Sequence, residues 1–151
     1  MVEIKTRTTI NVHEKYFPIY QEILENPEWG QRDNLKLFTI TVLIGKYIVG
    51  EQISLKNNSN TYLRVRDNDK KDDMTLLKCF AVLESGDINI LKDEDAMFTL
   101  CENYTTAGII KLKEWYDSND QDIILTLSEN LTDKFLDNKD KYFPDNDSNE
   151  E

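Results

Sequence analysis

The sequence of 151 residues has few of the residues that build turn-rich or histidine-ligated proteins. It contains five Gly, three Pro, two Cys and one His. So few Gly and Pro argue against a β-sandwich, whose short strands need frequent turns. The single histidine, His13, cannot form a two-histidine metal site, and we expect it to be a surface or capping residue.

The two cysteines have no C-x-x-C spacing, and both fall in apolar segments that look helical. We therefore expect Cys79 and Cys101 to be buried free thiols in a reducing compartment. A disulfide between two helices is the alternative. No apolar export signal follows Met1 and no apolar run is long enough to span a bilayer, so we expect a cytoplasmic protein without membrane contact.

The sequence also lacks the short motifs of common catalytic sites. It contains no P-loop, no H-E-x-x-H, no G-x-S-x-G and no dinucleotide fingerprint. A metal-dependent nuclease would need carboxylates around a metal ion and a nearby lysine. The only candidates would be Asp67, Asp69, Asp72 and Asp73, with Lys70. These acids lie in polar linkers, where helix capping and solubility explain them. We expect no catalysis, no metal and no cofactor.

Basic residues are in the minority, and the net charge is −11 with a pI of about 4.6. A broad DNA-binding face is therefore not expected, because phosphate affinity comes from clustered Lys and Arg. One local basic ribbon is present, and its arginines alternate with apolar residues, so both guanidinium groups would face one side of a strand. The ribbon consists of Lys56, Arg64, Arg66, Lys70 and Lys71. It would contact nucleic acid or an acidic partner. In the alternative, its arginines pair with Asp67 and Asp69 on a solvated hairpin.

The residues that are abundant are apolar ones, and they are concentrated in blocks. The segment from Asn34 to Val49 is apolar on every side, which predicts a buried central helix, with Asp33 as its N-cap and Gly50 just after its end. Apolar stripes predict four further helices around it. The third of these would break or bend near residues 105–108. Their approximate ranges are 13–26, 74–85, 93–116 and 120–135.

The remaining segments complete a mainly α-helical fold of about five helices. Residues 2–12 would form a short strand or an extended arm, and a small β-hairpin is expected near residues 52–66. We expect one domain over residues 1–136. Residues 137–151 hold six acids and two lysines, which predicts a disordered acidic tail. Three aromatic residues would line either the core or a partner groove: Tyr104, Trp115 and Tyr116.

Three segments together resemble a known family. They are LKLFTITVLIGKYIVGEQISL, LLKCFAVLESGDINILKD and ENYTTAGIIKLKEW. Proteins encoded beside DNA phosphorothioation (Dnd-type) and related bacterial defence systems have a similar order. An apolar helix ending in a glycine and a basic residue is followed by a hairpin-like insert, an A-x-x-x-x-G-D-x-x-I-L block and an E-x-Y-A-x-x-G block. The similarity covers roughly residues 13–116 and departs at Thr105, where the family pattern has Ala.

The resemblance implies a non-enzymatic accessory or adaptor protein in an anti-phage system that targets DNA. Such a protein would bind a larger protein subunit, with a possible DNA contact, as a monomer or a homodimer. The alternative is an acidic inhibitor or antitoxin-like protein that mimics DNA. The net charge and the acidic residues 137–151 favour this alternative.

Overall fold

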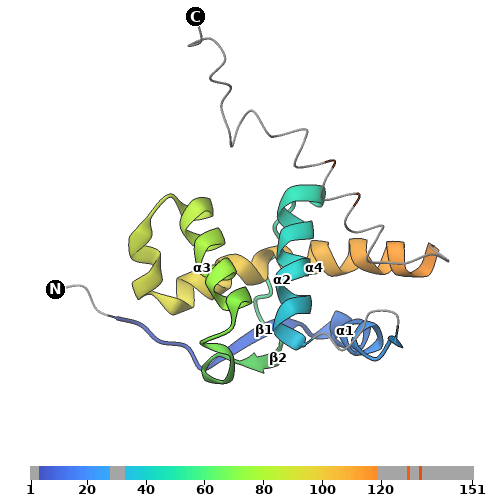
Figure 1. Cartoon of the computed structure of the whole chain (residues 1–151), viewed down its shortest axis with the longest axis horizontal. Coiled ribbons are helices and arrows are strands. Elements are labelled where there is room, and N and C mark those ends of the chain that lie inside the picture. Colours follow the sequence, from blue (N-terminus) through green and yellow to red (C-terminus); the bar gives the residue numbers. More distant parts are fainter. Residues whose placement is uncertain (1–3, 28–32, 119–128, 130–132, 134–151) are drawn as a thin grey trace, which may run out of the picture.

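The computed structural model describes residues 4–27, 33–118, 129 and 133 (Figure 1). Within them the chain is mainly helical and carries one small antiparallel sheet, which confirms the predicted fold class. The elements in chain order are β1 (Thr9–His13), α1 (Phe17–Leu24), α2 (Asn34–Ile44), β2 (Ser59–Arg64), α3 (Asp72–Ser85) and α4 (Glu94–Ser118). Short helical turns lie between them: η1 (Glu14–Tyr16), the π-helical η3 (Gly45–Val49), η4 (Arg66–Asn68) and η5 (Ile88–Lys92).

Helix α2 lies at the centre of the molecule, as predicted. The side chain of Asp33 caps its N-terminus by accepting a 2.7 Å hydrogen bond from the backbone N–H of Lys36. The helix continues through η3 and ends at Gly50, which has a φ of +73° and so adopts the left-handed conformation that favours glycine. Buried residues cover most of its circumference: Leu35, Leu37, Phe38, Thr39, Thr41, Val42 and Ile44. The remaining side, with Lys36, Ile40 and Leu43, is half-buried, so the expectation of burial on every side is only partly met.

Helix α4 crosses α2 at very close range (Figure 1). A Cβ at Gly45 would lie 2.8 Å from the carbonyl carbon of Tyr104, and a Cβ at Gly108 would lie 2.6 Å from that of Thr41. Each glycine therefore lets the backbone of the other helix approach. A break near residues 105–108, one of the two expectations for this stretch, is wrong, because α4 is continuous through Ser118. The small residues in that stretch permit close helix contact and do not interrupt the helix.

Strand β2 pairs with β1, and not with a neighbouring strand inside residues 52–66. The expectation of a local hairpin in that segment is therefore wrong. The register places Ile10 opposite Leu63 and Val12 opposite Asn60, with an irregularity between Ile10 and Asn11. Pairing with the N-terminal strand buries Ile10 and Val12 completely. The backbone N–H of Ile53 donates instead to the carbonyl of Asn103 on α4, at 2.7 Å.

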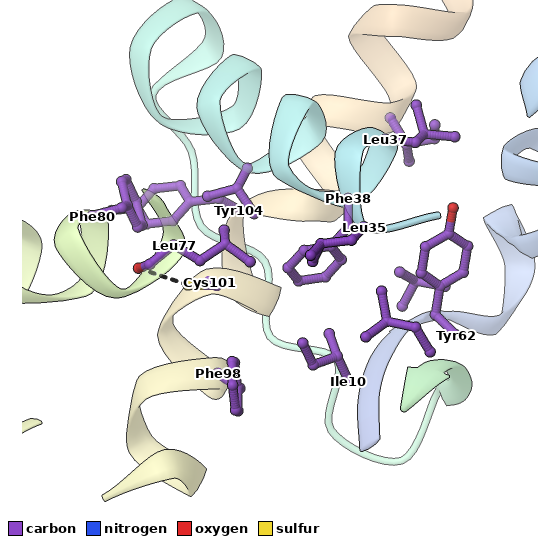
Figure 2. Packing of buried hydrophobic residues seen from close by; sticks show 14 of the residues in the cluster. Ile10, Leu35, Leu37, Phe38, Tyr62, Leu77, Phe80, Phe98, Cys101 and Tyr104 are labelled. Atoms are coloured by element: carbon purple, nitrogen blue, oxygen red, sulfur yellow. Dashed lines mark hydrogen bonds between the residues drawn. The ribbon is translucent and has the colours of Figure 1, made fainter. Parts of the chain in front are cut away.

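The core joins residues from both strands and all four α-helices (Figure 2). Phe38 of α2, Phe80 of α3, Phe98 of α4 and Ile10 of β1 belong to it. Helix α3 ends at Gly86, whose φ is +71°. The predicted helix over 120–135, apart from Glu129 and Asp133, and the acidic tail over 137–151 lie outside the described residues.

Candidate partner-binding surface

The residues of the predicted basic ribbon do not share one strand face. Strand β2 ends at Arg64, and Val65 has a helical backbone and is buried, so the chain turns before Arg66. Arg66 therefore belongs to the turn η4, and the expected alternation of the two guanidinium groups is wrong. Its side chain is exposed and lies 3.3 Å from Asp69, which agrees with the alternative in which acids of this segment pair with the arginines.

The remaining basic residues of the ribbon differ in their surroundings. Lys71 forms an ion pair of 3.2 Å with the N-cap residue Asp33, and Lys36 forms one of 3.1 Å with Asp73. Lys56, Arg64 and Lys70 are exposed and form no ion pair within the described part of the chain. Their charges are therefore available for a partner.

The three aromatic residues proposed for a partner groove do not lie together. Tyr104 is buried at the crossing of α2 and α4 and stacks edge-on with Phe80. Trp115 and Tyr116 are half-buried, about 16 Å further along the same helix. The hydroxyl of Tyr116 accepts a 2.7 Å hydrogen bond from the side chain of Asn26, at the end of α1. A single groove containing all three residues is therefore wrong.

Three side chains from the three segments of the resemblance meet beside the helix crossing. Glu84 of α3 accepts a 2.5 Å hydrogen bond from the hydroxyl of Tyr104 and lies 2.9 Å from the ammonium of Lys46. The same ammonium lies 5.7 Å from the centre of the Tyr104 ring. Burial, followed by the hydrogen bond to Glu84, raises the pKa of the Tyr104 hydroxyl. These contacts connect η3, which continues α2, with α3 and α4, so we call this group the three-helix cluster.

A second polar group joins the N-terminal arm to α4. The guanidinium of Arg7 donates to both carboxylate oxygens of Glu102, at 2.7 and 2.8 Å, and Glu102 also accepts from the backbone N–H of Asn11 at 2.7 Å. Both side chains are largely buried. Burial raises the pKa of Glu102, and Arg7 opposes that rise. The pair lines a cavity of about 280 Å³ that Lys56 also lines.

Three of the acids that a nuclease would have to use, Asp69, Asp72 and Asp73, have structural roles. Asp72 and Asp73 form the first turn of α3, where negative charge suits the helix dipole. Asp69 pairs with Arg66. In the part of the chain that the structure describes, no three His, Cys, Asp or Glu residues are grouped so that they could hold a metal ion. His13 caps η1, because its Nδ1 accepts from the backbone N–H of Lys15, which confirms its capping role.

An exposed apolar surface lies on α3 and η5, and the sequence did not predict it. Leu76 and Leu83 are apolar residues of α3, yet their exposed fractions are 44% and 75%. Cys79, expected to be buried, is also exposed and falls between them on the same side of the helix. The neighbouring η5 adds two exposed residues, Ile88 and Leu91. We call these five residues the α3–η5 surface.

The α3–η5 surface lies at the end of the molecule away from α1 (Figure 1). The buried face of α3 consists instead of Met74, Leu77, Phe80 and Ala81. A signal was present in the sequence, because apolar residues occupy more than one side of this helix. The apolar residues on one side of α3 pack into the core, and the apolar residues on the other side are exposed.

Comparison with known proteins identified no matching family model, no similar curated protein and no similar solved structure. Among the described helices, none combines the length and the apolar character that crossing a membrane requires.

Proposed function

We propose that this protein is a non-enzymatic accessory or adaptor protein of a bacterial DNA-targeting anti-phage defence system, of the DNA phosphorothioation or restriction type. It acts by binding a larger protein subunit. The sequence resemblance supports the type of system, and the α3–η5 surface is the observation that carries the binding role. Because such a system acts on DNA inside the cell, its proposed location is the cytoplasm.

The positions of the motif residues support a binding role. Lys46, Glu84 and Tyr104 form the three-helix cluster, and Gly108 permits the contact of α4 with α2. The residues that carry the resemblance therefore hold three helices in place. A rigid helical scaffold of this kind presents a surface to a partner, and that surface decides which partner binds.

The α3–η5 surface suits a protein partner. Leu76, Cys79 and Leu83 follow one another at spacings of three and four residues, so they form one stripe along α3. An exposed apolar stripe of this kind is typical of protein–protein contacts. The net charge of −11 favours a partner whose surroundings are positively charged, as the surfaces of DNA-handling subunits are.

A nucleic-acid contact is a secondary part of the proposal. Lys56, Arg64 and Lys70 are the residues of the basic ribbon that would make it, since no acid in the described part of the chain pairs with them. Two lysines and one arginine supply only a weak, salt-dependent contact. The partner subunit would therefore provide most of the DNA affinity of the assembly.

Copurification tests the proposal directly. The tagged full-length protein is expressed with the proteins encoded by its neighbouring genes and isolated in buffer of moderate salt. We expect it to retain a nuclease, ATPase or DNA-modification subunit at a fixed stoichiometry. Recovery without any such subunit would contradict the proposal. Recovery of a basic DNA-binding protein that free DNA displaces would favour the alternative, an acidic DNA-mimicking inhibitor.

A further inference from the structure

A polar cavity lies beside the Arg7–Glu102 pair, between three separate parts of the chain. Arg7 and Asn11 come from the N-terminal arm and β1, Glu102 and Asn103 come from α4, and the loop before β2 forms the third wall. Its volume of about 280 Å³ is just below the range that small-molecule sites occupy, roughly 300–1,000 Å³. Among the described residues that line it, Leu55 is the only apolar one. The cavity therefore suits a small hydrophilic ligand.

The loop that forms the third wall is held by backbone hydrogen bonds at both ends. The N–H of Ile53 donates to the carbonyl of Asn103 at 2.7 Å, and the N–H of Glu14 donates to the carbonyl of Asn58 at 2.7 Å. Between these two bonds, the N–H of Asn58 donates to the carbonyl of Leu55 at 2.9 Å and closes a turn. This wall of the cavity is therefore ordered before a ligand binds, which lowers the entropy cost of binding.

Lys56 lies within this turn and has a left-handed backbone. Its φ is +48°, and no other residue except glycine has a positive φ in the part of the chain that the structure describes. This conformation is unfavourable for a residue with a side chain, and such residues are concentrated at ligand sites. Lys56 is exposed, lines the cavity and forms no ion pair with a described residue. Its ammonium therefore brings an unpaired positive charge to the cavity.

Three further side chains of the lining have hydrogen-bonding groups to offer a ligand. They are Ser54 and Ser59, from the loop and the first position of β2, and Asn103 from α4. None of these three side chains forms a hydrogen bond with a residue that the structure describes. Two hydroxyls and one amide on two walls therefore accompany the charge of Lys56.

We infer that this cavity binds a phosphate group, carried by a free nucleotide or by a nucleic-acid strand. Lys56 supplies the positive charge, and lysine is a common phosphate ligand that acts as a point charge. The hydroxyls of Ser54 and Ser59 and the amide of Asn103 supply neutral donors from two sides. A phosphate group presents oxygens in several directions, so donors on different walls can each reach one.

A carboxylate fits this lining less well than a phosphate does. Carboxylates are best bound by the planar fork of an arginine, with two parallel hydrogen bonds. The guanidinium of Arg7 already donates to both oxygens of Glu102, at 2.7 and 2.8 Å, so its fork is occupied. The choice of nucleotides and nucleic acid as carriers rests on the proposed function, whereas the phosphate site does not, since none of its residues belongs to the α3–η5 surface.

NMR spectroscopy of the full-length protein tests the site with inorganic phosphate as the probe. Phosphate is added at constant pH and ionic strength, and acetate is added in a parallel titration. We expect weak but saturable shifts of the backbone amide signals of Lys56, Ser59 and Asn103, and no saturable shifts with acetate. An absence of saturable shifts with phosphate, or an equal response to acetate, would overturn the inference.

Two lysine variants separate the cavity from general charge effects. Lys56→Gln removes the charge beside the cavity, and the matched control Lys70→Gln removes one from an exposed, unpaired lysine that does not line it. We expect Lys56→Gln to weaken phosphate binding about tenfold, as loss of one charge-assisted hydrogen bond does, and Lys70→Gln to leave it unchanged. Ser59→Ala, which keeps every charge, should weaken binding severalfold. Equal affinities of all three variants would overturn the inference.

The carrier of the phosphate is tested with two further probes, thymidine 5′-monophosphate and a short single-stranded DNA oligonucleotide. Tighter binding of the mononucleotide than of inorganic phosphate, weakened by Lys56→Gln, would identify a free nucleotide. Tighter binding of the oligonucleotide, weakened by the same variant, would identify a nucleic-acid strand. If neither bound more tightly than inorganic phosphate, both carriers would be excluded. Such a failure would leave the copurification test of the proposed function unaffected.

Discussion

Gly108 lies directly against the main-chain carbonyl of Thr41, and this contact sets the distance between α4 and α2. The reciprocal contact of Gly45 with Tyr104 lies one turn along each helix. The buried central helix is thus held by backbone-to-backbone approach as well as by its apolar side chains. The motif residues of the resemblance lie at this crossing.

Substitution of Gly108 by alanine should destabilise the protein strongly. The new methyl group would overlap the Thr41 carbonyl, and main-chain atoms cannot move aside as a side-chain end can. We expect Gly108→Ala to lower the free energy of unfolding by about 3 kcal/mol, measured by urea denaturation. The matched control is Gly86→Ala, where nothing lies within 4 Å and only the positive φ opposes a side chain. That control should cost about 1 kcal/mol, and equal losses would contradict the account.

Removal of Arg7 should destabilise the protein in a pH-dependent way. Arg7→Met leaves the buried Glu102 carboxylate without its cation, at a cost of about 3 kcal/mol near neutral pH. The pKa of Glu102 already lies above its ordinary value of 4.5 because of burial, and loss of Arg7 raises it further. Since the protonated form is favoured in the folded state, the penalty should shrink as the pH falls toward that ordinary value.

Urea denaturation of Arg7→Met at pH 7 and at pH 5 measures this effect. The double variant Arg7→Met with Glu102→Gln is the control, because it carries no buried charge at this site. We expect the double variant to recover part of the stability at pH 7 and to change less with pH. A penalty for Arg7→Met that is independent of pH would exclude the charge of Glu102 as its cause.

Two buried tyrosines should respond differently to loss of their hydroxyl groups. The Tyr104 hydroxyl donates to the Glu84 carboxylate, so Tyr104→Phe should cost about 1.5 kcal/mol. The Tyr62 hydroxyl is buried and has no hydrogen-bond partner among the described residues. Tyr62→Phe should therefore leave stability unchanged or raise it. Thermal unfolding of both variants checks this order, and a larger loss for Tyr62→Phe would refute the assignment of the three-helix cluster.

The two thiols should differ in reactivity. Cys79 is exposed on α3, whereas Cys101 is completely buried, and burial raises the pKa of the Cys101 thiol to about 12. The thiolate is the reactive form, so Cys101 should not react in the folded protein near neutral pH. A thiol-specific chromogenic reagent should detect one thiol in the native state and two in urea. Detection of both thiols at the same rate without denaturant would contradict the structure.

The sequence was sufficient for elements whose signal is local. The apolar segment from Asn34 to Val49 predicted α2 as the central helix, and Asp33 and Gly50 marked the helix ends that the structure confirms. Contacts between distant segments were not predictable in the same way. Nothing local in Ser59–Arg64 indicates that its partner strand is Thr9–His13, about fifty residues earlier. Spacing alone also could not separate an outward apolar stripe, such as Leu76 and Leu83, from a buried one.

The candidate site was predicted only in part for related reasons. The basic residues were identified by type, but the turn at Val65 rotates Arg66 away from the strand alternation that placed it beside Arg64. Tyr104 was correctly recognised as a core residue in one of the two interpretations. Its link to Glu84 and Lys46 depends on three helices meeting, which no single stretch of sequence specifies.

The central claim is that the α3–η5 surface binds the partner subunit, and copurification of surface variants tests it most directly. Leu83→Asp introduces a charge at a residue that is 75% exposed, so the fold should persist while binding is lost. The control Gln21→Asp adds the same charge at an exposed residue of α1, at the other end of the molecule, without removing an apolar group. We predict that Leu83→Asp abolishes partner recovery at unchanged thermal stability and that Gln21→Asp retains it. Full recovery with Leu83→Asp would contradict the claim.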